Sequence, residues 1–288
     1  MISIIQELFG KIFIPLIIFS AIILSFPLQT ADPAANSDDP AREDLSRFVY
    51  PSQGRIIWVP HFIMPQETLE RLFGGDWVYV ARFNRLDRRH AYPGMTIKVP
   101  VHLADIRQYT PLPEYYEPAA RYPKYILIHV TEQWLGAYDY GHLTISMPAI
   151  TGKAVALTPL GIFHIDMHDR NHTSSLYKTE KGTEQYPMDW ALRFYVDDRH
   201  VGFWIHARDM PGHPASHGCV GLFDEVMQKR IYTVPVEPAL ADAKKLYKWA
   251  LSGNLNVYDP DGPEQMDDGP IVEITGNLPS YLPAPPRQ

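Results

Sequence analysis

One cysteine is present in the 288-residue chain, Cys219, and it ends the segment Ser216-His217-Gly218-Cys219. His206 lies thirteen positions upstream. A thiol acts as a nucleophile only in its thiolate form, which a nearby base or a positive potential favours. The imidazole of His206 or of His217 is the obvious proton acceptor. The pattern therefore predicts nucleophilic chemistry at Cys219, and the alternative is a small buried cysteine without a chemical role.

Residues 224–230 follow the cysteine and are predicted to form a short helix, because acidic residues begin the segment and basic residues end it. Leu222, Val226 and Met227 would share one face of this helix. Cys219 would then lie just ahead of a helix N-terminus, whose free N–H groups lower the pKa of a thiol and can hold an oxyanion. An ion pair with His206 would lower the pKa of Cys219 in the same direction.

Strands are expected to hold these groups, because the surrounding sequence alternates between apolar and polar residues. They are predicted at residues 124–130, 133–138, 143–150, 158–165 and 201–205, the last of which ends at His206. Short strands joined by tight turns are typical of an antiparallel sheet folded into a sandwich or barrel. The 27 prolines and 17 tyrosines also favour short strands and loops over a helical bundle.

The N-terminal part of the chain predicts export. Residues 12–27 carry no charge and follow Lys11, as in a secretory signal. Residues 28–35 offer no clean small-x-small cleavage site, so an anchor retained in the inner membrane is the alternative. Cysteines are normally paired in an oxidising compartment, so an unpaired exported thiol calls for a reason. The net charge of -7 argues against a nucleic-acid partner.

Residues 56–102 are expected to form a small α+β module with strands at residues 56–59 and 95–100 and a helix at residues 67–72. A second helix is predicted through residues 80–84, capped by Asp76. This order resembles a LysM domain, and three segments carry the resemblance: Glu67-Thr68-Leu69, Arg82-Phe83-Asn84 and residues 92–100. LysM domains bind the glycan of cell walls, which the resemblance implies as a partner. Residues 59–66 replace the tight Gly-Asp turn usual in that family, so glycan binding and a purely structural role both stay open.

Six segments after residue 123 together resemble the L,D-transpeptidase catalytic domain, the YkuD-like family. They are residues 124–128, 132–135, 151–153, 158–161, 204–206 and 216–220. The resemblance implies a β-rich fold that cross-links peptidoglycan through a cysteine acyl-enzyme. By position, Cys219 matches the nucleophile and His206 the base. Ser216, His217 and Gly218 match the motif around the nucleophile, and backbone N–H groups near Gly218 would support the oxyanion.

Three features depart from the pattern of that family. Ala207 replaces the glycine or serine that often follows the first histidine, although its backbone carbonyl could still orient the imidazole. Gly221 stands where many members carry arginine, which removes one charged group from the edge of the site. A helix is inserted at about residues 238–251, and we expect it to pad the sandwich, the alternative being that it borders the cleft. Its apolar side would carry Leu240, Ala243, Tyr247 and Ala250.

A zinc hydrolase is the alternative chemistry, because histidines recur at close spacing. His164, His168 and His172 are four residues apart, and a second set comprises His200, His206, His213 and His217. A spacing of four brings side chains together on a helix, but the first set begins on a predicted strand. We therefore predict no metal and no cofactor.

The sequence thus predicts a mainly β protein, in which a small α+β LysM-like module precedes a sandwich or barrel-like L,D-transpeptidase catalytic domain. The expected division is a signal peptide or membrane anchor (1–35), a linker (36–55), the LysM-like module (56–102), a Pro- and Tyr-rich connector (103–122), the catalytic domain (123–276) and a disordered tail (277–288). The implied function is that of a peptidoglycan L,D-transpeptidase of the periplasm or cell envelope, which acts on stem peptides and glycan. An L,D-carboxypeptidase or murein-cleaving amidase using the same cysteine stays open, as does a catalytically silent glycan-binding wall protein.

Overall fold

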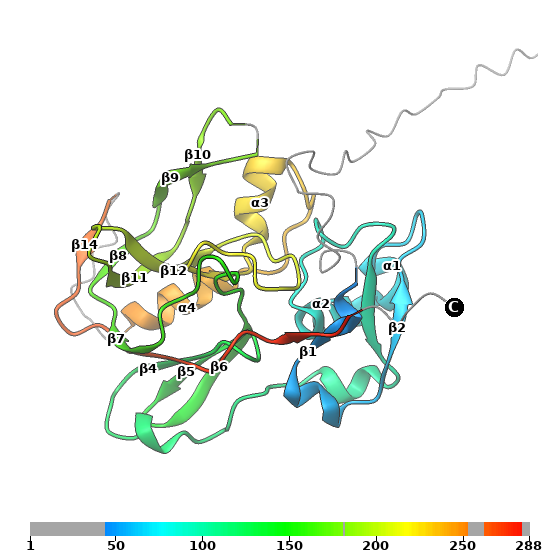
Figure 1. The fold of residues 1–288 in the computed structure, drawn as a ribbon, viewed down its shortest axis with the longest axis horizontal. Helices are drawn as coiled ribbons and strands as arrows, with labels where there is room; N and C mark the ends of the chain where they lie inside the picture. Colours follow the sequence, from blue (N-terminus) through cyan, green and yellow to red (C-terminus); the bar gives the residue numbers. More distant parts are fainter. Residues whose placement is uncertain (1–43, 181, 253–261, 284–288) are drawn as a thin grey trace, which may run out of the picture. The chain divides into compact units, whose positions relative to one another are not determined.

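The computed structural model describes residues 44–180, 182–252 and 262–283, which belong to one compact unit. Their strands form two five-stranded and three two-stranded sheets, so the prediction of a mainly β protein is confirmed (Figure 1). The expected signal peptide or anchor lies outside the described residues. No helix within the described part of the chain is long and apolar enough to cross a membrane.

The first five-stranded sheet has the strand order β6-β5-β4-β15-β7. Its strands are β4 (Tyr125–His129), β5 (Trp134–Asp139), β6 (His142–Pro148), β7 (Gly161–His164) and β15 (Ile271–Thr275). The alternating segments form the expected antiparallel meander of β4, β5 and β6. The expectation of a wholly antiparallel sheet is wrong, because β15 enters beside β4 in parallel after a long excursion of the chain.

The second five-stranded sheet has the order β13-β12-β11-β8-β14. It contains His206 and the strand that follows Cys219. Its strands are β8 (Met167–Asp169), β11 (Ala191–Val196), β12 (Gly202–Ala207), β13 (Val220–Leu222) and β14 (Glu264–Gln265). Strand β12, which contains His206, pairs in parallel with β13, which follows Cys219 directly. A separate hairpin is formed by β9 (Thr173–Lys178) and β10 (Gln185–Pro187).

The two large sheets share one apolar core with the helices α3 (Glu225–Tyr232) and α4 (Asp242–Leu251). Helix α4 buries Ala243, Leu246 and Tyr247 in this core. The inserted helix therefore pads the sandwich, as predicted, although it begins at Asp242 and not at residue 238.

The N-terminal module has the order β2 (Trp58–Phe62), α1 (Leu69–Phe73), α2 (Trp77–Asn84) and β3 (Thr96–Pro100), with β2 antiparallel to β3. Thr68 caps α1 by accepting a hydrogen bond from the Arg71 N–H group at 3.3 Å. Asp76 precedes α2 without capping it, because its carboxylate binds the guanidinium of Arg107. The prediction of an Asp76 side-chain cap is therefore wrong.

The predictions of a linker at 36–55 and a disordered tail at 277–288 are wrong for their described parts, residues 44–55 and 277–283. Strand β1 (Phe48–Val49) pairs with β16 (Ser280–Tyr281). Leu45, Phe48 and Tyr50 are buried, because these apolar side chains join the core of the module. Short 3₁₀ helices complete the described chain: η2 (Leu45–Arg47), η3 (Pro51–Arg55), η4 (Gly74–Asp76), η5 (Leu103–Ile106) and η6 (Glu117–Ala119).

The module does not bury its apolar residues alone. Its core cluster includes Ile150, Met210, Phe223 and Leu240 from the catalytic part of the chain. The buried guanidinium of Arg85 donates to the Glu132 carbonyl oxygen through Nε at 3.1 Å and Nη2 at 2.8 Å. A buried charge is tolerated only when its donors are satisfied, so this contact ties the two parts together firmly.

Candidate active site

Cys219 lies at the entrance to β13, beside Trp204 of β12. The side chain is partly exposed and packs against an apolar cluster of Met188, Ala191 and Trp204. Burial of the sulfur raises the pKa of Cys219 to about 11. A hydrogen bond from the Trp204 backbone and the positive charge of Arg208 act in the opposite direction, because both stabilise a thiolate.

His206 is held inside β12 and is only 4% exposed. Its Nδ1 atom lies 2.7 Å from the carbonyl oxygen of Ala207, the contact anticipated from the sequence. Since a carbonyl oxygen can only accept, Nδ1 carries the proton and Nε2 is the free base. Burial lowers the pKa of His206 to about 3; the Ala207 contact raises it, and the charges of Arg208 and His172 lower it further.

The expectation that a helix begins just after the thiol is wrong. The helix α3 does not begin just after Cys219, because β13 intervenes, and the Met227 N–H group in its first turn donates to Asp224 Oδ1 at 2.8 Å. Val226 is 57% exposed, so it does not share the buried face of Leu222 and Met227. Burial raises the pKa of the thiol and lowers that of the imidazole, and both directions favour neutral groups over an ion pair.

Ser216, His217 and Gly218 form the turn that leads into Cys219. Ser216 is buried, and its N–H group donates to the Thr151 carbonyl oxygen at 3.1 Å. His217 is exposed and stacks on Tyr177 of β9, with ring centroids 4.4 Å apart. Gly218 has φ +119°, and a Cβ atom there would lie 2.5 Å from Phe203 Cε1. Only glycine fits this turn without strain.

Arg208 is a charged group that the sequence interpretation missed. Its aliphatic carbons would lie 2.6–3.1 Å from a Cβ atom at position 221, so Gly221 makes room for this side chain. The charge of Arg208 lowers the pKa of Cys219, His206 and His217. The absence of an arginine at position 221 therefore does not leave the site without a cation. An arginine one residue after Ala207 was the available signal.

Residues 123–266, half of the chain, match the YkuD family, the L,D-transpeptidase catalytic domain. The chain belongs to the L,D-transpeptidase family. A comparison with curated proteins finds no match.

Solved L,D-transpeptidases are similar to part of the chain. The enzyme from Stackebrandtia nassauensis is 22% identical over 57% of this chain and 60% of that chain, with a TM-score of 0.37. L,D-transpeptidase 1 from Mycobacterium tuberculosis is 17% identical over 54% of this chain and 62% of that one, with a TM-score of 0.34. An L,D-transpeptidase from Mycobacterium smegmatis is 15% identical over 54% of this chain and 59% of that one, with a TM-score of 0.34. The chain thus spans about 60% of the length of these structures.

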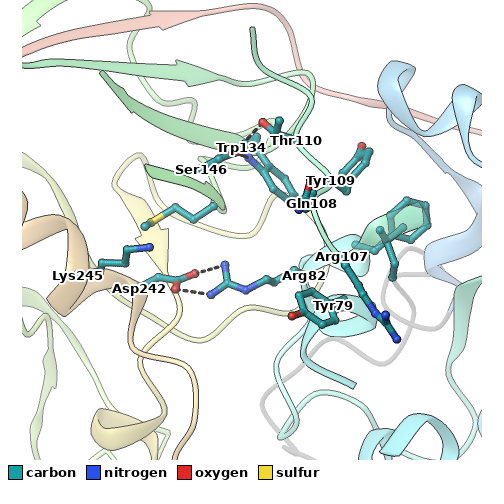
Figure 2. Close-up of a pocket in the computed structure, with 13 residues that line it drawn as sticks. Tyr79, Arg82, Arg107, Gln108, Tyr109, Thr110, Trp134, Ser146, Asp242 and Lys245 are labelled. Atoms are coloured by element: carbon teal, nitrogen blue, oxygen red, sulfur yellow. Dashed lines mark hydrogen bonds and ion pairs between the residues drawn. The ribbon is translucent and has the colours of Figure 1, made fainter. Parts of the chain in front are cut away.

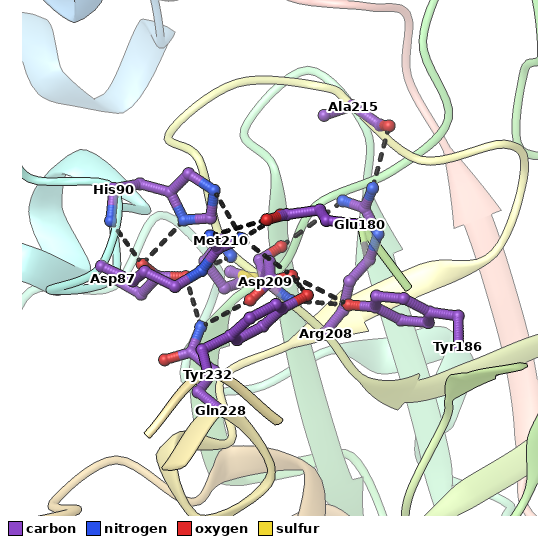
Figure 3. A network of polar contacts seen from close by, with 11 residues as sticks. Asp87, His90, Glu180, Tyr186, Arg208, Asp209, Met210, Ala215, Gln228 and Tyr232 are labelled. Carbon is purple, nitrogen blue, oxygen red and sulfur yellow. Dashed lines mark hydrogen bonds and ion pairs between the residues drawn. The ribbon is translucent and has the colours of Figure 1, made fainter. Parts of the chain in front are cut away.

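The N-terminal module supports the loop that precedes Ser216-His217-Gly218-Cys219. Figure 3 shows the carboxylate of Asp87 accepting hydrogen bonds from the Met210 N–H group and from Gln228 Nε2, both at 2.6 Å. The Asp87 N–H group donates to the Met210 carbonyl oxygen at 2.8 Å. On the same loop, Arg208 donates to the Ala215 carbonyl oxygen at 3.0 Å. Asp87 therefore fixes the segment that runs from β12 to Ser216.

Replacing Asp87 with alanine is expected to lower the free energy of unfolding by about 3 kcal/mol, because buried donors lose their acceptor. Burial opposes ionisation of Asp87, but its contacts with His90 and Met210 outweigh it and hold the pKa at about 2. Since this pKa lies below that of the unfolded chain, the contribution of Asp87 is present above about pH 4 and is lost toward pH 2. Urea unfolding between pH 2 and pH 7 measures both effects, with exposed Asp105→Ala as the control. Equal stability of the two variants would contradict the assigned role.

The histidines considered as metal ligands have separate partners. His168 Nδ1 lies 2.9 Å from the Tyr247 hydroxyl, and His172 Nδ1 lies 2.9 Å from Asp169 Oδ2. Within the described ranges, Asp87, His90 and Asp209 have the spacing of a metal-ligand group. Arg89 Nη2 lies 3.4 Å from Asp209 Oδ2, so a guanidinium already supplies the positive charge there.

A cavity of about 260 Å³ lies away from the catalytic residues, between the module and the catalytic domain (Figure 2). Its walls include Arg82 and Asp242, which form a two-pronged ion pair at 2.8 Å and 2.6 Å. Trp134 Nε1 donates to Ser146 Oγ at 2.7 Å. These polar groups already satisfy one another, so the cavity supplies no reactive group.

Proposed function

We propose that the protein is a peptidoglycan L,D-transpeptidase that forms an acyl-enzyme at Cys219. The observation that supports the proposal is the placement of His206 on β12 and of Cys219 directly before β13, the parallel neighbour of β12, within the domain of this family. His206 pairs with Gly221 and Ile205 pairs with Val220, so Cys219 comes level with Trp204, two residues before His206 on β12.

In the first half-reaction, the sulfur of Cys219 attacks the carbonyl carbon between an L-centre and a D-residue of a stem peptide. Nε2 of His206 takes the thiol proton and returns it to the leaving amine of D-alanine. Because thiol and imidazole are both neutral at rest, the proton moves as the C–S bond forms and not beforehand. Arg208 and the Trp204 backbone stabilise the negative charge that develops on sulfur.

The turn before Cys219 would hold the oxyanion. Gly218 has no side chain to block the approach of a carbonyl oxygen, so the backbone N–H groups around Gly218 and Cys219 can reach it. Ser216 fixes this turn through its backbone contacts with residues 151–153, and His217 shapes its outer side against Tyr177. The Ala207 carbonyl orients the base. An acceptor amine of a second stem peptide then resolves the thioester.

The N-terminal module serves the catalytic domain structurally in this proposal. The shared core, the buried Arg85 contact and the Asp87 network support that role. Its resemblance to LysM leaves glycan binding as an additional proposal. We further propose a location in the cell envelope, on the strength of the apolar stretch at residues 12–27 and of the family's wall substrate.

Mass spectrometry of muropeptides after incubation with the full chain and a disaccharide tetrapeptide tests the proposal. Cross-linked dimers are the expected product, and Cys219→Ala should yield none. Shortened monomers without dimers would show a carboxypeptidase, and cleaved peptide or amide bonds would show an amidase. Unchanged substrate, together with equal binding of wild type and Cys219→Ala to sacculi, would show a glycan-binding protein without activity.

A further inference from the structure

We propose that His172, oriented by Asp169, takes the proton from the acceptor amine in the second half of the transfer. The proposal rests on the function proposed above, and it assigns to this pair a step that His206 alone serves poorly. The pair lies on the face of the second sheet that carries the thiol and the first base. Three observations place it there: strand register, a hydrogen bond and a ring contact.

Register brings Asp169 to the catalytic face. Asp169 pairs with Ala191, and Leu192 pairs with Ile205, which places Ala191 beside His206 in the same row. Residues paired across strands project to the same side of a sheet. His168, one residue before Asp169, points to the opposite face, where it contacts Tyr247 in the core. Ala191, the residue between Asp169 and His206 in this row, is fully buried.

His172 occupies the turn after β8 and reaches back over this face. Its Nδ1 atom lies 2.9 Å from Asp169 Oδ2, so Nδ1 carries the proton and Nε2 is the base. The ring packs on Trp204, with centroids 4.2 Å apart. Trp204 in turn hydrogen-bonds to Cys219 through its backbone, and the charge of His172 acts on His206. One aromatic side chain therefore links His172 to the thiol.

The environment of His172 suits a base that exchanges protons with solvent. Its side chain is 24% exposed and that of Asp169 is 9% exposed, whereas His206 is 4% exposed. The hydrogen bond to the Asp169 carboxylate holds the His172 ring in one orientation. Burial of His206 disfavours its charged form, so that residue is suited to passing a proton within the site.

The proton balance of aminolysis requires such a group. An aliphatic acceptor amine is an ammonium at neutral pH and has no lone pair for attack. His172 Nε2 takes one proton, and the neutral amine then forms the C–N bond while the C–S bond breaks. The second amine proton passes through His206 to the sulfur of Cys219 and restores the thiol. The imidazolium of His172 releases its proton to water.

The test compares two acceptors on the full chain: D-methionine, an ammonium at pH 7, and hydroxylamine, which is mostly neutral. His172→Gln should still accumulate the acyl-enzyme from disaccharide tetrapeptide, measured by intact mass. Transfer to D-methionine should fall about 100-fold, the range of general base catalysis, and transfer to hydroxylamine should change by no more than about twofold. Asp169→Asn should give a smaller loss in the same direction. His164→Gln, on an exposed strand residue, is the matched control.

An equal fall with both acceptors, or no fall with either, would overturn the role of His172. Thermal unfolding of each variant shows whether a loss reflects the fold, and Asp169→Asn retains the imidazole if His172→Gln is unstable. Failure of wild type to form any acyl-enzyme would overturn the proposed function and this inference with it. Acylation with unchanged acceptor preference would overturn this inference alone.

Discussion

Replacing Cys219 with serine is expected to lower the rate of transfer by a factor on the order of 10³ or more, as removal of a nucleophile does in other covalent enzymes. A hydroxyl forms almost no alkoxide at neutral pH, and the weak base His206 cannot compensate for this. The same change should abolish the covalent adduct of a carbapenem, whose strained carbonyl suits a thiol beside an oxyanion hole. Dimer formation and intact mass measure the two effects.

Cys219→Ser should unfold at a temperature close to that of wild type, because the side chain at this position is partly exposed. Cys219→Ala provides a second variant with no nucleophile. Retention of more than a few per cent of the transfer rate in either variant would remove Cys219 from the mechanism. A carbapenem adduct on Cys219→Ala would lead to the same conclusion.

Much of the fold followed from local patterns. The predicted strands at residues 124–130 and 133–138 match β4 and β5 nearly to the residue, although the structure buries almost every side chain of both strands and not only alternate ones. The parallel partners β15 and β13 could not be deduced, since pairing across a long connection depends on tertiary packing and not on local sequence. The composition of residues 36–55 likewise concealed Leu45, Phe48 and Tyr50, three apolar residues within a polar segment.

The candidate site divides in the same way. Cys219, His206 and the Ala207 carbonyl lie on two adjacent segments, so their spacing was enough to find them. The side chain of Arg208 packs over Gly221, and the ring of His172 packs on Trp204. These are contacts between neighbouring strands, so the spacing of residues along the sequence does not predict them. The Asp169-x-x-His172 spacing was visible, but a carboxylate three residues from a histidine is common in solvated turns.

Iodoacetamide is expected to alkylate Cys219 of the free enzyme slowly at pH 7, with a rate that rises toward a pKa of about 11. The thiolate is the reacting form, so raising the pKa lowers the reactive fraction at every pH below it. Relative to the free-thiol value of about 8.5, this pKa corresponds to a thiolate fraction at pH 7 that is lower by a factor of about 300. The chain unfolded in urea, whose thiol has an ordinary pKa, is the reference.

Variants of His206 and Arg208 distinguish a neutral Cys219 thiol and His206 imidazole from a thiolate–imidazolium ion pair. If His206 held the thiolate, His206→Gln would move alkylation from below pH 7 to pH 8 or above, near the free-thiol value of about 8.5. In the neutral arrangement, His206→Gln should move the profile little, whereas Arg208→Met should move it to higher pH, because Arg208 is the cation that lowers the pKa of Cys219. Fast alkylation of wild type below pH 7 that disappears in His206→Gln would establish the ion pair. The proton would then leave the sulfur before the substrate arrives, and Arg208 would have no part in forming the thiolate.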